Sequence, residues 1–98
     1  KQHDLDPFVV AALIGQESSY VADVRSPANA WGLMQILPTT GARLARVDGV
    51  RRFRTSMLTD PETNVRLGTR YFANLVRELG GVPYALAGYN AGEGRVVR

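Results

Sequence analysis

The sequence predicts a small, predominantly α-helical α+β domain. Its 98 residues are 45% apolar and include no cysteine, so one core has to form by packing without disulfides. Four stretches have helical patterns, and each opens at a proline, a residue favoured in the first helical turn. Residues 20–37, between the first two helices, are punctuated by Ser26-Pro27 and Gly32, which predicts a loop region with room for one small hairpin.

The first two helices have clear boundaries in the sequence. Asp6-Pro7 combines a preferred N-cap residue with a preferred first residue, so the first helix is expected from there to about Ser19. The second helix is expected to open at Pro38, to reach about Val47 and to end at Asp48-Gly49.

The third helix is expected to be the longest. Thr59-Asp60-Pro61-Glu62 offers both a Thr-x-x-Glu capping box and an Asp-Pro start. A Gly80-Gly81 stop ends its apolar stripe, which comprises Val65, Gly68, Phe72, Leu75 and Leu79. A fourth helix is expected from Pro83 to near Tyr89, followed by a glycine-rich turn and another candidate helix at 93–98.

Glu17 is the most unusual residue of the first helix. Helical spacing puts it above Val10, Leu13 and Ile14 in the otherwise apolar run 9–18. Burial penalises a carboxylate anion, and a negative charge at a helix C-terminus opposes the macrodipole, so nothing in stability favours this placement. A carboxyl that is readily protonated serves instead as a proton donor. The alternative is a Glu17 that turns outward to water or pairs with an arginine.

Two more polar clusters lie in apolar, glycine-punctuated surroundings, Gly32-Leu33-Met34-Gln35-Ile36 and Ala87-Gly88-Tyr89-Asn90-Ala91-Gly92. With Glu17-Ser18 they resemble, in order and spacing, the three signatures of the soluble lytic murein transglycosylase family (SLT domain, lysozyme-like superfamily). The resemblance covers nearly the whole chain, and its other matching residues are Asp6-Pro7, Gln16, Ser26-Pro27, Pro38, Asp60-Pro61-Glu62-Thr63-Asn64 and Leu67-Gly68. Each motif alone is weak, whereas together and in this order they are specific.

The resemblance implies a lysozyme-like fold, with four or five short helices around a substrate groove, and a lytic transglycosylase activity. Such a lyase cleaves the β-1,4 bond between N-acetylmuramic acid and N-acetylglucosamine in peptidoglycan and leaves 1,6-anhydromuramoyl ends. In the family, one glutamate protonates the glycosidic oxygen and the substrate's N-acetyl group stabilises the positive charge. The same glutamate then takes the proton of the 6-hydroxyl. Glu17 is the expected catalytic residue, because nearly every other acidic residue has a cap, turn or surface explanation.

The resemblance also implies a set of substrate-binding residues, namely Ser18, Gly32, Met34, Gln35, Tyr89 and Asn90. Ser18 would orient the substrate acetamido group, and Gly32 would allow a close backbone approach. Met34 would form an apolar wall or belong to the core, and Gln35 would bond to a sugar or to the site backbone. Tyr89 would close the site and bond to Glu17, the alternative being a half-buried ring with its hydroxyl in water.

No metal ion or other cofactor is expected. The chain has no cysteine for a thiolate site, and its single histidine, His3, lies near the N-terminus, away from any Ser-His-acid arrangement. No apolar stretch reaches the length of a membrane span.

The net charge of +3 makes the chain a candidate for binding nucleic acid, anionic lipid or an acidic cell-wall polymer. Arg51-Arg52-Phe53-Arg54 is the densest basic cluster, and we expect it to be a solvated loop with no nucleic-acid partner, because no nucleic-acid module surrounds it. By resemblance, the partner is the glycan strand of peptidoglycan, with peripheral association with the cell wall. The expected location is periplasmic or extracellular, at the cell envelope, as a monomer or part of a larger protein.

The expected domain is residues 1–98, and it lacks the family's last helix. Family members continue past the Tyr-Asn-Ala-Gly motif into a helix with a Glu-Thr signature, whereas this sequence ends at Arg98. Two alternatives to a lytic transglycosylase therefore stay open. One is a lysozyme-type peptidoglycan hydrolase on a similar fold, and the other is a non-catalytic glycan-binding remnant.

Overall fold

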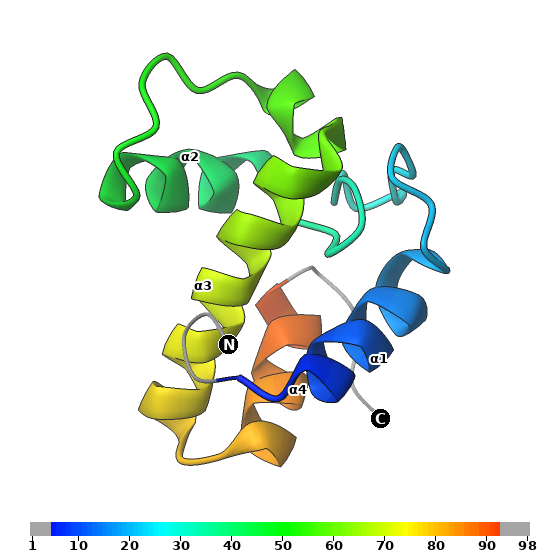
Figure 1. Cartoon of the computed structure of the whole chain (residues 1–98), viewed down its shortest axis with the longest axis vertical. Helices are drawn as coiled ribbons and strands as arrows, with labels where there is room; N and C mark the ends of the chain where they lie inside the picture. The colour runs from blue at the N-terminus through cyan, green and yellow to red at the C-terminus, as the bar shows by residue number, and fades with distance from the viewer. Residues whose placement is uncertain (1–4, 93–98) are drawn as a thin grey trace.

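Helices dominate the computed structural model, which describes residues 5–92 (Figure 1). In chain order they are α1 (Pro7–Ser18), α2 (Pro38–Val47), the short 3-10 helix η2 (Thr55–Thr59), α3 (Pro61–Leu79) and α4 (Val82–Gly92). The predominantly helical prediction is confirmed. The expected hairpin is reduced to two isolated antiparallel bridges in the loop 19–37, which join Arg25 to Trp31 and Trp31 to Ile36.

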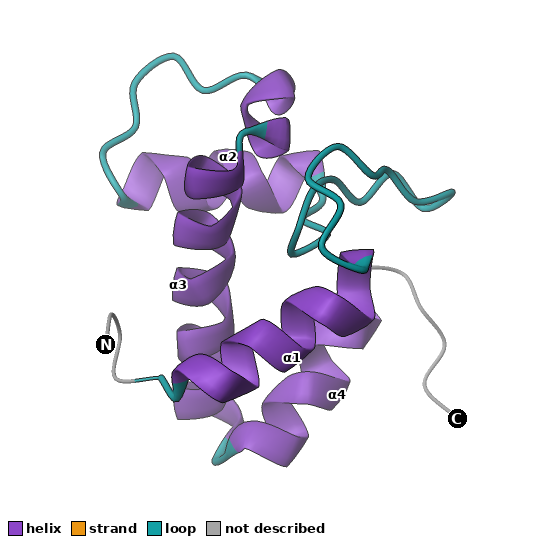
Figure 2. Cartoon of the chain, turned by 45° about the vertical axis from the view of Figure 1, so that its right-hand side comes forward, coloured by secondary structure: helices purple, strands orange, loops and turns teal. Residues whose placement is uncertain are grey.

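Helix α3 organises the fold. It contacts α2 and η2 along one part of its length and α4 along another, while α1 lies in front of α4 in Figure 2. One continuous core joins all these elements, and its largest members include Leu13, Met34, Leu44, Leu58, Leu67, Phe72 and Tyr89. No helix within residues 5–92 is long and apolar enough to cross a membrane.

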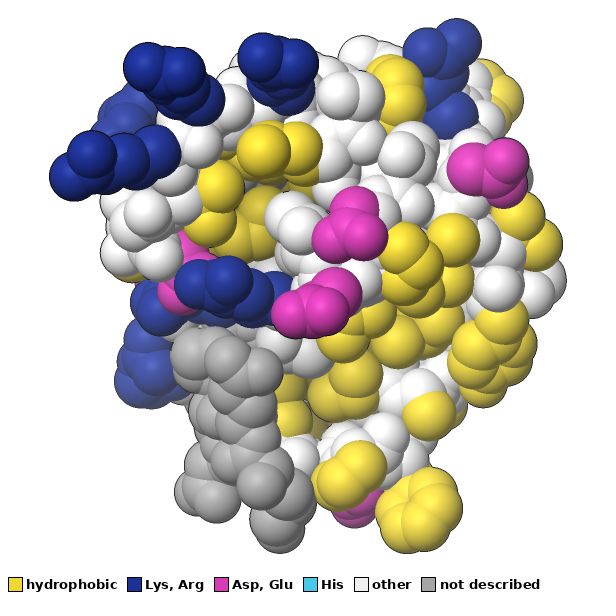
Figure 3. Space-filling model, turned by 45° about the horizontal axis from the view of Figure 1, so that its top comes forward, with side chains coloured by type: hydrophobic (Ala, Val, Ile, Leu, Met, Phe, Trp, Pro, Cys, Tyr) yellow, Lys and Arg dark blue, Asp and Glu magenta, His cyan; other side chains and the backbone are white. Residues whose placement is uncertain are grey.

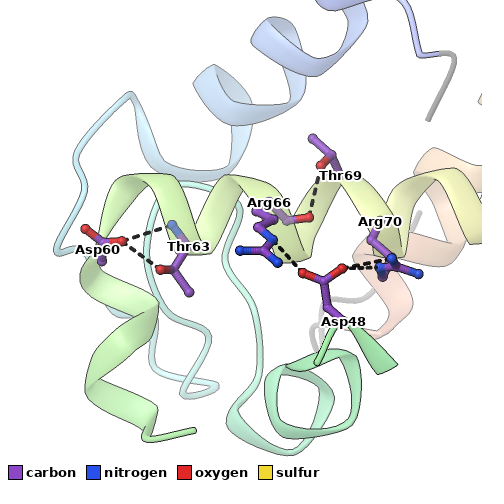
Figure 4. Close-up of polar contacts among 6 residues, drawn as sticks. All are labelled: Asp48, Asp60, Thr63, Arg66, Thr69 and Arg70. Atoms are coloured by element: carbon purple, nitrogen blue, oxygen red, sulfur yellow. Dashed lines mark hydrogen bonds and ion pairs between the residues drawn. The ribbon is translucent and has the colours of Figure 1, made fainter. Parts of the chain in front are cut away.

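The helix starts follow from local hydrogen bonds. Asp6 accepts a bond of 2.9 Å from the backbone N–H two residues along the chain. Asp60 accepts bonds from the backbone N–H (3.0 Å) and the hydroxyl (2.7 Å) of Thr63 (Figure 4). The Thr63 hydroxyl, and then its N–H, holds the pKa of Asp60 below its usual range. The predicted capping box at Thr59 is wrong, because the Thr59 hydroxyl donates to the carbonyl of Ser56 and Asp60 is the N-cap.

An ion-pair cluster ties the end of α2 to the middle of α3. Asp48 is the C-cap of α2, and its side chain is only 12% exposed. It accepts hydrogen bonds from Nε (3.1 Å) and Nη2 (2.8 Å) of Arg70 and pairs with Nε of Arg66 at 2.5 Å (Figure 4). Asp48, which was expected only to end a helix, therefore also joins α2 to α3. Isolated surface ion pairs stabilise proteins little, but this largely buried carboxylate pairs with two arginines.

Two boundaries differ from the sequence prediction. Residues 55–59 form η2 where a loop was expected, and α4 continues to Gly92 instead of ending near Tyr89. Helix α4 meets α3 at Gly88, where a Cβ would lie 2.7 Å from Cδ1 of Leu79. The candidate helix at 93–98 lies outside the described residues.

Candidate functional site

Glu17 lies in the last turn of α1 and is buried. It is 5% exposed and lies on the same side of the helix as Leu13, which is 2% exposed. The prediction of a carboxyl on the core stripe is confirmed, and the alternative of a side chain turned outward to water is wrong. The next residue, Ser18, is also buried, and its hydroxyl donates to the carbonyl of Ile14 (3.0 Å). Ser18 would have to give up this bond before donating to a substrate.

Tyr20 braces the helix end that carries Glu17. The chain leaves α1 through two successive left-handed residues, Ser19 (φ 53°) and Tyr20 (φ 63°). The Tyr20 hydroxyl then donates to the carbonyl of Ala11 at 2.9 Å. Its ring lies against Gly15, where a Cβ would be 3.0 to 3.1 Å from ring and hydroxyl atoms. Gly15 thus makes room for the Tyr20 ring to pack against α1.

The loop 31–36 is closed by its own hydrogen bonds. Trp31 and Ile36 exchange both backbone N–H to carbonyl bonds at 2.9 Å. Gln35, which has a left-handed φ of 50°, donates from its side-chain nitrogen to the carbonyls of Gly32 (2.9 Å) and Val24 (3.2 Å). Gln35 was expected to bond either to a sugar or to the site backbone. Both of its amide hydrogens bond to the loop backbone, which leaves its side-chain oxygen for any contact with a sugar.

Asn64 of α3 binds this loop through side-chain hydrogen bonds, although the sequence analysis assigned it no role. Its side-chain oxygen accepts from the N–H of Met34 (2.8 Å), and its nitrogen donates to the carbonyls of Trp31 (2.9 Å) and Leu58 (2.8 Å). Gly32 makes this contact possible, because a Cβ there would lie 2.2 Å from both the Asn64 nitrogen and the Leu58 oxygen. The close approach expected at Gly32 is thus made to Asn64, and its φ of 79° also suits glycine.

Tyr89 joins α4 to the same loop. It is fully buried, its hydroxyl donates to the carbonyl of Met34, and its ring packs on Tyr71 with centroids 5.2 Å apart. The alternative of a half-buried Tyr89 with its hydroxyl in water is therefore wrong. Met34 is also fully buried, with its sulfur packed against Gly68, so its present position is that of a core residue.

Asn90 follows Tyr89 in the last turns of α4 and is half-buried. Its side-chain oxygen is inaccessible to solvent and accepts no hydrogen bond from any residue among 5–92. A buried acceptor of this kind is costly unless a donor reaches it, and the Asn90 oxygen could bond to a substrate only after a change that exposes it. Within the same residues, no group of three or more His, Cys, Asp or Glu side chains is arranged to hold a metal ion.

Three motifs far apart in the sequence thus share one core. Leu13, one turn before Glu17, packs in the same core as Met34 and Tyr89, and Met34 bonds to both Asn64 and Tyr89. The model of the family described as transglycosylase SLT domain matches residues 1–98. The chain belongs to the SLT domain family.

Relatives of this SLT domain have closely similar sequences and folds. It is 37% identical to the soluble lytic murein transglycosylase of Salmonella typhimurium over 95% of the chain and 15% of that relative. It is 34% identical to the membrane-bound lytic murein transglycosylase C of Sodalis glossinidius over the whole chain and 30% of that relative. An inactive Glu-to-Gln mutant of the Pseudomonas aeruginosa lytic transglycosylase Slt superposes with a TM-score of 0.84 at 34% identity, over 94% of the chain and 15% of that protein.

The SLT domain therefore spans about 15% of the length of the soluble relative. The prediction of a lysozyme-like fold is confirmed.

Asn64 is the site residue that the sequence analysis did not identify. A signal for it existed, because Asn64 lies on the buried stripe of α3 with Leu67 and Gly68, as Glu17 does on that of α1. A polar residue on a core stripe needs a partner, and that criterion applied to 61–79 singles out Asn64.

Proposed function

We propose that residues 1–98 form a peptidoglycan lytic transglycosylase domain. It would cleave the β-1,4 bond between N-acetylmuramic acid and N-acetylglucosamine and form 1,6-anhydromuramoyl ends. The observation that carries the proposal is the buried carboxyl of Glu17 at the end of α1, one turn after Leu13, which packs in the same core as the two other family motifs. The names of the soluble and membrane-bound relatives support the same reaction class.

A single carboxyl suffices for this reaction. Glu17 would first give its proton to the glycosidic oxygen as the bond to the muramic C1 breaks, while the substrate's acetamido group stabilises the positive charge at C1. The resulting Glu17 carboxylate would then take the proton of the 6-hydroxyl, whose oxygen bonds to C1 and closes the anhydro ring. Atoms balance without water, and the 5% exposure of Glu17 helps to keep water from competing. The inactive Glu-to-Gln mutant of the Slt relative supports an essential glutamate in that protein.

The substrate-binding residues complete the proposal. Asn90 would accept a hydrogen bond from a sugar after a change that exposes its buried oxygen, and Ser18 would orient the acetamido group after leaving the Ile14 carbonyl. Gln35, Met34 and Tyr89 would act mainly by holding the loop 31–36 and the end of α4 in register. Gly32 would serve the site through the approach of its backbone to α3.

The surface fits peripheral association with an acidic cell wall, at the cell envelope. The net charge is +3, and the basic side chains lie mostly toward the upper and left edges of the face in Figure 3, with hydrophobic side chains between them. In the cluster Arg51-Arg52-Phe53-Arg54 the arginines are exposed, whereas Phe53 packs against α2 at Gly41. A ring used for packing is not available to stack on bases, which argues against a nucleic-acid partner.

The test is a digest of purified peptidoglycan followed by mass spectrometry of the muropeptides. A lytic transglycosylase is expected to produce 1,6-anhydro ends, lighter by one water than reducing ends. Reducing ends would instead support a lysozyme-type hydrolase. Binding to the glycan without any new chain ends would support a non-catalytic glycan-binding domain.

A further inference from the structure

Tyr20 is an exposed aromatic residue with a fixed position on the outer side of α1. It is 64% exposed and lies outside the hydrophobic core. Its hydroxyl nevertheless donates to the carbonyl of Ala11 (2.9 Å), and its ring lies against Gly15. Burial in the core therefore does not explain why the ring takes this position. We call the bond to Ala11 and the packing on Gly15 together the Tyr20 contact.

The Tyr20 contact and Glu17 lie on opposite sides of α1. Gly15 stands two residues before Glu17, which is a turn of about 200° around the helix axis. The same offset separates Ala11, which is exposed, from Leu13, which is buried. The core thus holds the last turns of α1 from the inside, and Tyr20 holds them from the outside.

The end of α1 has several features that weaken a helix. Its last carbonyls lack the partners that carbonyls in the middle of a helix have, and Gly15 adds backbone freedom. A carboxylate at Glu17 also opposes the helix macrodipole. The chain then leaves through two left-handed residues, Ser19 and Tyr20, a conformation unfavourable for residues other than glycine. A helix end of this kind opens readily unless tertiary contacts hold it.

Gly15 and Tyr20 fit each other closely. A Cβ at position 15 would lie 3.0 Å from the Tyr20 hydroxyl oxygen and 3.1 Å from two carbons of its ring. A larger residue at position 15 would push the ring outward and lengthen its bond to Ala11. Because glycine is a poor helix residue, the place of the ring on α1 comes at a local cost in helix stability.

Tyr20 also begins the loop that leads to the second motif. Four residues further along, the carbonyl of Val24 accepts from the N–H of Gly32 (2.8 Å) and from the side-chain nitrogen of Gln35 (3.2 Å). A shift of Tyr20 would therefore move both the end of α1 and the start of this loop. These are two parts of the proposed site whose relative position has to be kept for catalysis.

We propose that Tyr20 is a positioning residue, which fixes the last turn of α1 through the Tyr20 contact and so holds the Glu17 carboxyl where it transfers protons. The assignment rests on the proposed function, because the proton transfers by Glu17 are what require a fixed position. A displacement of about 1 Å in such a group can cost about 100-fold in rate. The competing role is a direct contact of the exposed Tyr20 ring with a sugar.

Tyr20→Phe separates the two roles, because it removes the hydroxyl and keeps the ring. The kcat for new chain ends on soluble glycan strands is expected to fall about tenfold, with KM and the urea midpoint nearly unchanged. The matched control is Tyr84→Phe, since Tyr84 is 65% exposed and its hydroxyl forms no hydrogen bond within residues 5–92. A fall in kcat no larger than that of Tyr84→Phe would overturn the proposal. A rise in KM at constant kcat would overturn it too, because it would show a sugar contact.

Gly15→Ala tests the packing of the ring. Alanine favours the helix, so the urea midpoint is expected to stay or rise, whereas the displaced ring is expected to lower kcat several-fold. Activity and stability would thus change in opposite directions, which a merely structural role does not predict. In the Tyr20→Phe background the same substitution is expected to lower kcat little further, because the bond to Ala11 is already lost. Equal falls in both backgrounds would contradict the pairing of Gly15 with Tyr20.

Hydrogen exchange tests the Tyr20 contact without any catalysis. The N–H of Ser19 donates to the carbonyl of Gly15 (2.9 Å), so its exchange rate reports opening of the last turn. Tyr20→Phe is expected to speed this exchange about three- to tenfold, the effect of losing one hydrogen bond, and to leave that of Leu67 in α3 unchanged. Unchanged exchange at Ser19 would overturn the proposal. Failure of the proposed function is distinguishable, because no variant would then form new chain ends while Ser19 would still report the Tyr20 contact.

Discussion

Asn64→Leu should destabilise the domain strongly, because it removes the three hydrogen bonds that tie the loop 31–36 and η2 to α3. Leucine has the same branching but is larger, so crowding by its methyl groups at these 2.8–2.9 Å contacts adds to the loss. The Trp31 carbonyl keeps its bond from Ile36, but the N–H of Met34 and the carbonyl of Leu58 lose their Asn64 partner. A buried group left without a partner costs about 1–3 kcal/mol, so the two groups give a total of about 2–6 kcal/mol. That is a large part of a typical stability of about 5–15 kcal/mol.

The assay is urea unfolding followed by the fluorescence of Trp31, the only tryptophan in the chain and a direct partner of Asn64. The control is Asn74→Ala, on the same helix, whose side-chain oxygen accepts a bond only from the exposed Arg77. It should cost about 0.5 kcal/mol or less. The reasoning would be refuted if Asn64→Leu lost no more stability than Asn74→Ala.

Three further predictions concern single residues. Glu17→Gln should lower the rate of anhydro-end formation by about two to four orders of magnitude and leave glycan binding and the urea midpoint nearly unchanged, because the amide keeps the shape and loses the transferable proton. A variant that cleaves at the wild-type rate would contradict the site. Gly32→Ala should destabilise by at least about 2 kcal/mol more than Gly49→Ala in the same urea assay. Both glycines have similar left-handed φ values, 79° and 77°, but only at position 32 would the new Cβ clash; equal costs would rule out the clash. Asp60→Asn preserves the cap acceptor and removes the charge, so the wild type should be the more stable at neutral pH. Because the folded-state pKa of Asp60 is lowered, that advantage should disappear as pH falls through it, and an advantage that persists in urea unfolding at lower pH would contradict the role of the charge.

The sequence alone determined the parts of the fold that depend on neighbours within one helical turn. The starts at Asp6-Pro7 and Asp60-Pro61 and the stop at Gly80 lie where predicted, because a cap bonds to a backbone group two to four residues away. The burial of Glu17 was predictable for a related reason, since helical spacing alone placed it with Leu13. Its catalytic role remains a prediction, as do the roles of the substrate-binding residues.

Only the tertiary structure decided which distant groups meet. Asn64 reaches Met34 across 30 residues of chain, Tyr89 reaches Met34 across 55, and Asp48 reaches Arg70 across 22. Periodicity says that a side chain faces the core but not which backbone group it will meet there, because that depends on how helices pack. Helix packing also explains why α4 continues past Tyr89, although the local glycine content predicts an end there. The hydrogen bond from Tyr89 to Met34 and the core around Tyr89 stabilise the last turns of α4.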